Sequence, residues 1–183
     1  MSSTHAEQIV EAADLLHRTL RKLIISEHGA HAETLVAAGG RMAGTMLFHS
    51  FSFEPDRLRP GTVFLSDEAD EQGPGLIRLM FATLGQLGHQ GLDEQTVLAR
   101  AERSALSRLS LAETQRLLTP WYRKIQGLCG LSLREVADAG AIATAMSIHD
   151  CQSTLPVPSG CAIAVDGIVE SAKTVPQRIA AAP

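Results

Sequence analysis

Apolar residues recur at three- and four-residue steps along most of the chain, which is the spacing of amphipathic helices. In the first such segment, about residues 5–26, the apolar positions are Ile9, Ala13, Leu16, Leu20 and Leu23. After Ser110 the same pattern is carried by Leu111, Thr114, Leu118, Trp121 and Ile125. Both segments are therefore predicted to be helices that bury one stripe and leave the opposite face polar.

Helix ends are marked by capping residues. Three segments begin with a hydroxyl residue followed three positions later by glutamate, the capping-box pattern in which each side chain satisfies a backbone amide. The pairs are Thr4–Glu7, Ser110–Glu113 and Ser132–Glu135. The glycines that follow periodic segments, where they favour a helix end, are Gly29, Gly88, Gly127 and Gly130. Two more helices are expected to begin at Gly73-Pro74 and at Asp93.

Two segments are apolar on nearly every face. From Thr34 to Phe51 the only charged residue is Arg41, and from Val136 to Ile148 the only one is Asp138. A helix that is apolar all round is surrounded by protein. We therefore expect two central helices whose many alanines and glycines let neighbouring backbones approach closely, either within the chain or across a dimer.

Residues 54–75 interrupt the helical pattern with several prolines and glycines. They hold six acidic and two basic residues, which equals the net charge of −4 of the whole chain. We expect an irregular acidic connection here, with a short extended piece at Thr62–Leu65 that has no sheet to join.

The C-terminal region fits two structures. Residues 160–172 contain Asp166-Gly167, which is compatible with a hairpin, but their small apolar residues also suit a last helix. We favour the helix, capped at Ser159 and closed before Pro176, because no other segment supplies partner strands. Residues 174–183 are expected to form a frayed tail.

Composition places the chain among globular proteins. Its 183 residues are 45% apolar and 20% charged, enough for a packed core. No apolar run reaches the roughly 18 residues of a membrane span, and the first residues are too acidic for a signal peptide. Three cysteines without CxxC spacing favour reduced, mostly buried thiols. We expect one all-α domain over residues 1–183, a bundle of about six or seven helices, located in the cytoplasm. Arginine outnumbers lysine thirteen to three, which is typical of a GC-rich bacterial genome.

Two features suggest nucleic-acid binding, and neither is convincing. Residues 132–147 have the outline of a helix-turn-helix, but the second half offers no Arg, Lys, Asn or Gln to base edges, which favours one continuous buried helix. Residues 100–134 carry seven basic and two acidic residues, with Trp121 close to Arg123. Because the whole protein is acidic, we expect a solvated basic face that meets residues 54–75 of the same or a neighbouring chain, and no nucleic-acid partner.

Metal and catalytic motifs are equally weak. His28 and His31 flank a glycine, and His149-Asp150-Cys151 aligns three possible ligands, but neither set has the spacing of a known metal motif. On a helix His149 and Cys151 would point to different sides, so this histidine does not activate that thiol. The sequence therefore predicts no metal and no cofactor, names no catalytic residue, and leaves open whether the protein is an enzyme.

The lone charges of the two apolar segments are the strongest candidates for a site. Arg41 and Asp138 are costly to bury alone, so we expect them to form a buried ion pair or to converge on a polar pocket that Glu33, His49 and His149 join. The favoured function is protein association by a non-enzymatic homodimer. The alternative is binding of, or catalysis on, a small anionic ligand between the central helices, with Arg41 as anchor and His49 or His149 as acid or base.

Overall fold

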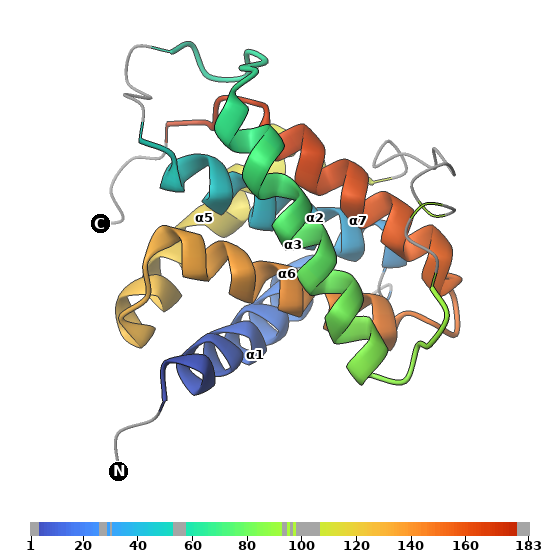
Figure 1. Ribbon diagram of the computed structural model, residues 1–183. Coiled ribbons are helices and arrows are strands. Elements are labelled where there is room, and N and C mark those ends of the chain that lie inside the picture. The colour runs from blue at the N-terminus through green and yellow to red at the C-terminus, as the bar shows by residue number, and fades with distance from the viewer. Residues whose placement is uncertain are drawn as a thin grey trace.

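The computed structural model describes residues 4–25, 29, 31–52, 58–92, 95, 97 and 107–178. In these residues it contains six helices and no sheet, so the predicted all-α bundle is confirmed (Figure 1). The helices are α1 (His5–Ile24), α2 (Ala32–Ser50), α3 (Asp67–Gln86), α5 (Leu111–Cys129), α6 (Leu133–Asp150) and α7 (Val157–Ala172). None of the described helices combines the length and the apolar character needed to cross a bilayer.

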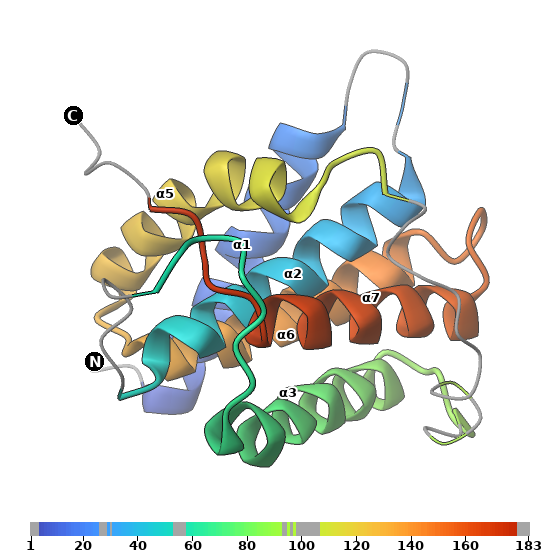
Figure 2. The same cartoon turned by 90° about the horizontal axis from the view of Figure 1, so that it is seen from above.

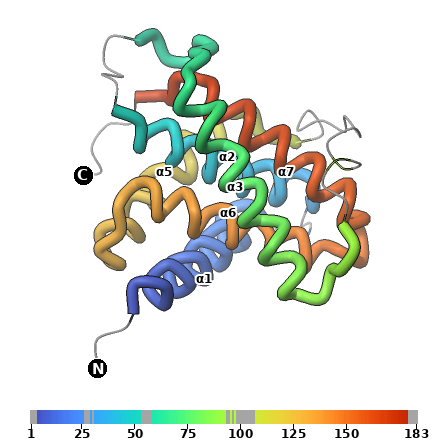
Figure 3. Tube along the Cα trace, viewed as in Figure 1, coloured from blue at the N-terminus to red at the C-terminus, as the bar shows by residue number. Residues whose placement is uncertain are grey.

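Helix α2 forms the centre of the bundle, as predicted. Nearly all of its residues between Ala32 and Phe48 are buried, and it makes its most extensive contacts with α7 and α6. Figure 2 shows α3 on one side of this group of three helices and α5 on the other. Helix α1 packs against α6 and α5. The tube in Figure 3 follows the same arrangement along the chain. The predicted second central helix is α6, and α7 is an additional buried helix.

Glycines bring α2 into backbone contact with its neighbours. A Cβ atom on Gly40 would overlap the carbonyl oxygen of Ala164 in α7, and one on Gly39 would lie 2.7 Å from Thr144 Oγ1 in α6. On α6, a Cβ on Gly140 would lie 3.2 Å from the Cα of Ala43. The small residues of these helices therefore pack within one chain.

Most predicted helix ends are confirmed. All three capping boxes form, and they begin α1, α5 and α6. Gly130 follows α5 with a φ of 64°, a left-handed conformation that glycine adopts easily, whereas Gly127 lies inside that helix. Helix α6 runs without a break through Gly140, so the continuous helix is confirmed and the helix-turn-helix outline is not.

The acidic connection is shorter than predicted. Helix α3 begins at Asp67, where the Ser66 side chain accepts a hydrogen bond from the Ala69 amide, and not at Gly73-Pro74. Pro74 lies within the helix. The acidic residues of the first turn are stabilising there because their charges oppose the positive end of the helix dipole. Of the predicted irregular segment, residues 58–66 are non-helical; residues 53–57 and the expected start at Asp93 lie outside the described residues.

The C-terminal region forms the favoured helix, with two corrections. Helix α7 begins at Val157 without a side-chain cap; Pro158, in its first turn, has a fixed φ suited to a helix start, so the expected cap at Ser159 is wrong. The tail is not frayed over residues 174–178. The Val175 amide donates to the Thr62 carbonyl at 2.9 Å, and Val175 is buried. This pairing also gives the extended piece at Thr62–Leu65 a partner.

Candidate functional site

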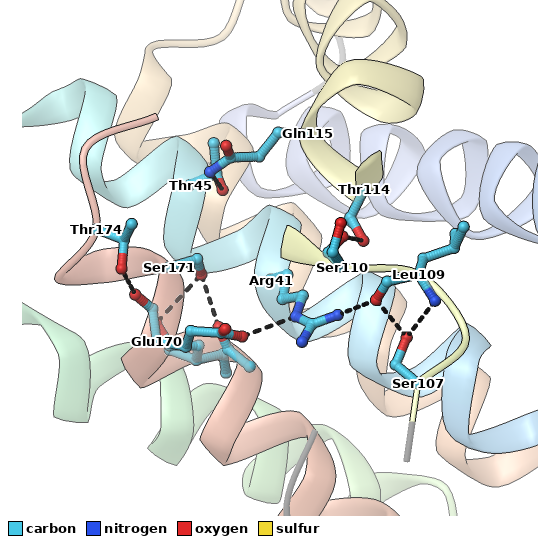
Figure 4. Close-up of polar contacts among 12 residues, drawn as sticks. Arg41, Thr45, Ser107, Leu109, Ser110, Thr114, Gln115, Glu170, Ser171 and Thr174 are labelled. Carbon is cyan, nitrogen blue, oxygen red and sulfur yellow. Dashed lines mark hydrogen bonds and ion pairs between the residues drawn. The ribbon is translucent and has the colours of Figure 1, made fainter. Parts of the chain in front are cut away.

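Arg41 is held by groups on two other parts of the chain. Its Nε donates to Glu170 Oε2 at 2.8 Å, and its Nη1 donates to the carbonyl oxygen of Leu109 at 2.5 Å (Figure 4). The arginine side chain is only 5% exposed, whereas that of Glu170 is 36% exposed. The buried guanidinium is thus neutralised from the α7 side, and the expected pair with Asp138 is wrong.

Asp138 lies on a different face of the bundle. Its Oδ1 accepts from Arg134 Nε at 3.2 Å, one turn earlier in α6, and Arg134 also donates to Gln72 of α3. Because Gly140 faces α2, a residue two positions earlier on the helix points away from α2. Burial raises the pKa of Asp138, and the Arg134 charge opposes this effect.

A pocket of about 350 Å³ lies beside Glu170, between the start of α5 and the end of α7. Its lining includes Gln115, which is 1% exposed. The side chain of Gln115 donates through Nε2 to Thr45 Oγ1 at 3.1 Å, and its Oε1 accepts from the backbone N–H of Gln177 at 3.1 Å. The pocket is therefore at the edge of the bundle and not between the two central helices, where the sequence indicates it.

The other predicted residues occupy opposite ends of the central helices. α2 and α6 are antiparallel, so His49, in the last turn of α2, and His149, in the last turn of α6, are far apart along the pair. Burial, with a smaller effect of the Arg123 charge, lowers the pKa of His49 to about 4. Its Nε2 is buried without a hydrogen-bond partner among the described residues. Glu33 lies at the other end of α2, 3.5 Å from His31 Nε2. The five residues do not form one site.

Near His149, the neighbouring groups are already engaged. Asp150 pairs with Arg21, and its Oδ2 lies 3.1 Å from His17 Nε2. Burial raises the pKa of the Cys151 thiol, which is the opposite of what a nucleophile needs. His149 itself contacts His89: its Nδ1 lies 2.9 Å from His89 Nε2. No sequence signal connects these two histidines, which are sixty positions apart.

The other histidines that the sequence offers as metal ligands are His28 and His31. His31 caps α2, with Nδ1 accepting from the Thr34 amide at 3.3 Å, and His28 lies outside the described residues. The described part of the chain contains no group of three or more metal-ligating side chains.

Helix α5 carries apolar residues on two faces. The inward face is buried through Leu118, Tyr122 and other residues, as the periodicity predicts. Trp121 was expected on that buried stripe, but it is 39% exposed and lies on the outer face between Leu117 and Leu128, which are 36% and 71% exposed. The steps between positions 117, 121, 124 and 128 are four, three and four, so these residues form a single stripe with coiled-coil spacing. Lys124 completes it, with its Nζ 5.5 Å from the Trp121 ring centroid.

No protein-family model matches the chain, and no curated protein or solved structure shows significant similarity to it.

Proposed function

We propose that the protein acts through protein association as a homodimer, and that the outer stripe of α5 is the dimer surface. The observation that supports this most is the exposure of Leu117, Trp121 and Leu128 on one side of one helix. Burying a large apolar side chain that is otherwise exposed contributes roughly 1.5–3 kcal/mol, so removing this stripe from water favours association.

The stripe is self-complementary in an antiparallel pair of α5 helices. With the two-fold axis between positions 122 and 123, Leu117 faces the partner's Leu128, and Trp121 faces the partner's Lys124. Each contact occurs twice. The ammonium group then lies over an indole ring, a favourable cation–π arrangement. A parallel pair would instead place the two Lys124 side chains against each other, so the antiparallel arrangement is favoured.

Space around the stripe suits a second helix. A Cβ atom on Gly127, beside the stripe, would have no neighbour within 4 Å, so a partner helix can approach closely there. One helix pair buries less than the roughly 1,600 Å² of a standard interface. We therefore expect a reversible dimer with a dissociation constant on the order of micromolar.

We also infer a reducing compartment, in keeping with a cytoplasmic protein. Cys129, Cys151 and Cys161 are all free thiols, and burial raises the pKa of each, most strongly that of Cys161, to about 12. Cys151 and Cys161 are buried and Cys129 is partly buried, and reduced thiols are typical of a reducing compartment.

The experiment is light scattering combined with the fluorescence of Trp121, the single tryptophan of the chain. We expect the wild type to have about twice the 19.5 kDa chain mass at high concentration, and its Trp121 emission to shift to longer wavelength on dilution. Leu128→Glu should give a monomer. The matched control is Val10→Glu on α1, which changes a residue that is 60% exposed outside the stripe and should leave the dimer intact.

Two outcomes would contradict this proposal. One is a wild type that stays monomeric up to concentrations of about 1 mM, well above the expected dissociation constant. The other is a Leu128→Glu variant that dimerises as strongly as the wild type, because association would then use a different surface.

The alternative, a small anionic ligand anchored by Arg41, has less support. The guanidinium already donates to Glu170 and to the Leu109 carbonyl. The adjacent pocket exposes the Glu170 carboxylate, which repels an anion.

A further inference from the structure

Two histidines from distant parts of the sequence face each other near the C-terminal ends of α3 and α6. His89 lies in the turn after α3, and His149 lies in the last turn of α6. His89 Nε2 and His149 Nδ1 are 2.9 Å apart, with ring centroids 5.1 Å apart and the rings inclined by 64°. Both side chains are half-buried, so the pair is fixed by the fold and still accessible to solvent.

We propose that His89 and His149 together bind a divalent transition-metal ion of the Ni²⁺, Cu²⁺ or Zn²⁺ class. Imidazole nitrogens bind such ions at about 2.0–2.1 Å. If an ion lies about 2.0–2.1 Å from each of two nitrogens that are 2.9 Å apart, the N–metal–N angle is roughly 90°. This is the angle between neighbouring ligands of an octahedral or square-planar ion. The separation of the two nitrogens therefore matches two adjacent coordination positions, and each ring turns to aim its lone pair at the ion instead of at the other nitrogen.

A metal ion can replace the hydrogen bond between the two neutral imidazoles without an unbalanced proton. One of the two facing nitrogens carries the proton of their hydrogen bond, and metal binding requires both to be unprotonated. The proton can move to the other nitrogen of the same ring, because an imidazole has two tautomers. A neutral pair thus binds the ion without net proton release.

The surroundings define the type of ion and the strength of binding. Asp150, next in sequence to His149, is engaged by Arg21, and the described residues provide no third ligand. Water must fill the remaining positions, so binding is weaker than in a three- or four-ligand site. Two nitrogen ligands without a carboxylate disfavour Mg²⁺ and Ca²⁺, which prefer oxygen.

A bound ion would connect the end of α3 to the end of α6. Since α5 contributes no ligand, this site does not depend on the proposed dimer. An ion that binds only the folded state raises its stability, so the melting temperature should increase with the concentration of Ni²⁺ or Zn²⁺.

The test is calorimetric titration of the untagged, chelator-treated protein with Ni²⁺ and Zn²⁺, with Mg²⁺ for comparison. We expect one Ni²⁺ per chain, and a loss of affinity of at least about tenfold in His89→Gln and in His149→Gln. His5→Gln is the matched control, because His5 is an exposed histidine that pairs with Glu135 elsewhere in the fold. It should bind as the wild type does.

A second measurement uses only the wild type, so it does not depend on the variants folding. In histidine-selective ¹⁵N spectra, Zn²⁺ should move the resonances of two of the seven histidines, with the largest effects at His89 Nε2 and His149 Nδ1. The proposal is overturned by the absence of saturable Ni²⁺ and Zn²⁺ binding, by binding that both variants retain, or by shifts confined to other histidines.

Discussion

Arg41 of α2 and Glu170 of α7 form an ion pair across the most extensive helix contact of the bundle, with Nε and Oε2 separated by 2.8 Å. The pair depends on its small neighbours. A Cβ atom on Gly167 would lie 3.1 Å from the backbone nitrogen of Arg41 and 3.4 Å from its Cγ, so a side chain at this position would press on the α2 backbone at Arg41. The ion pair and the glycine packing are therefore parts of one interface.

Removing the guanidinium should destabilise the fold strongly. We expect Arg41→Ala to lower the free energy of unfolding by about 2–5 kcal/mol, because the variant leaves a cavity at the α2–α7 contact and removes the hydrogen bonds that Glu170 and the Leu109 carbonyl accept. Urea denaturation measures this change. The control is Arg18→Ala, which breaks an exposed pair with Asp14 and should cost less than about 1 kcal/mol. A small effect of Arg41→Ala, accompanied by loss of a bound anion, would instead support the ligand-binding alternative.

The close approach of α2 and α7 gives a second prediction. Gly40→Ala places a Cβ atom against the Ala164 carbonyl, where the backbone cannot move without separating the helices, so we expect a loss of at least about 1–3 kcal/mol. Gly85→Ala in α3 is the control, because its new Cβ meets nothing within 4 Å. Alanine is the better helix former, so this change should raise stability by about 0.5–1 kcal/mol. Thermal and urea denaturation of both variants would show whether the two effects have opposite signs.

Sequence patterns predicted the features that depend on short-range interactions. The capping boxes involve residues three positions apart, and all three form. The start of α3 was misplaced because Gly73-Pro74 has the pattern of a helix start, whereas Ser66, eight residues before Pro74, caps the helix and the proline falls inside it. Trp121 was assigned to the wrong face since α5 has apolar residues on both sides, and periodicity does not show which side meets the core.

The candidate site depended on long-range contacts that no local pattern contains. The expectation that Arg41 requires a partner was correct in kind, but that partner, Glu170, is 129 positions away and was not identified. Asp138 points away from α2, and its i,i+4 neighbour Arg134 compensates its charge. One sequence feature points to Glu170. It follows Gly167 by about one turn of α7, and the missing side chain of Gly167 leaves room for the Arg41 side chain to reach it.

The buried imidazole of His49 predicts a loss of stability in acid. Its pKa of about 4 in the folded protein lies below the ordinary 6.5, so below pH 6.5 the unfolded chain binds a proton that the folded chain does not. The free energy of unfolding should therefore decrease as the pH falls from about 6.5 to about 4, by on the order of 3 kcal/mol from this group, and it should not respond to His49 above about pH 7.5.

Urea denaturation of His49→Gln at a series of pH values tests this prediction, because glutamine does not titrate and the acid-induced loss should become smaller. Burial also lowers the pKa of His17, so His17→Gln should remove a separate part of the same loss. His5→Gln is the control of opposite sign: its contact with Glu135 raises the pKa of His5, so this residue cannot cause a loss of stability in acid. If His49→Gln leaves the full acid-induced loss in place, His49 accepts a proton in the folded protein and is not held neutral by burial.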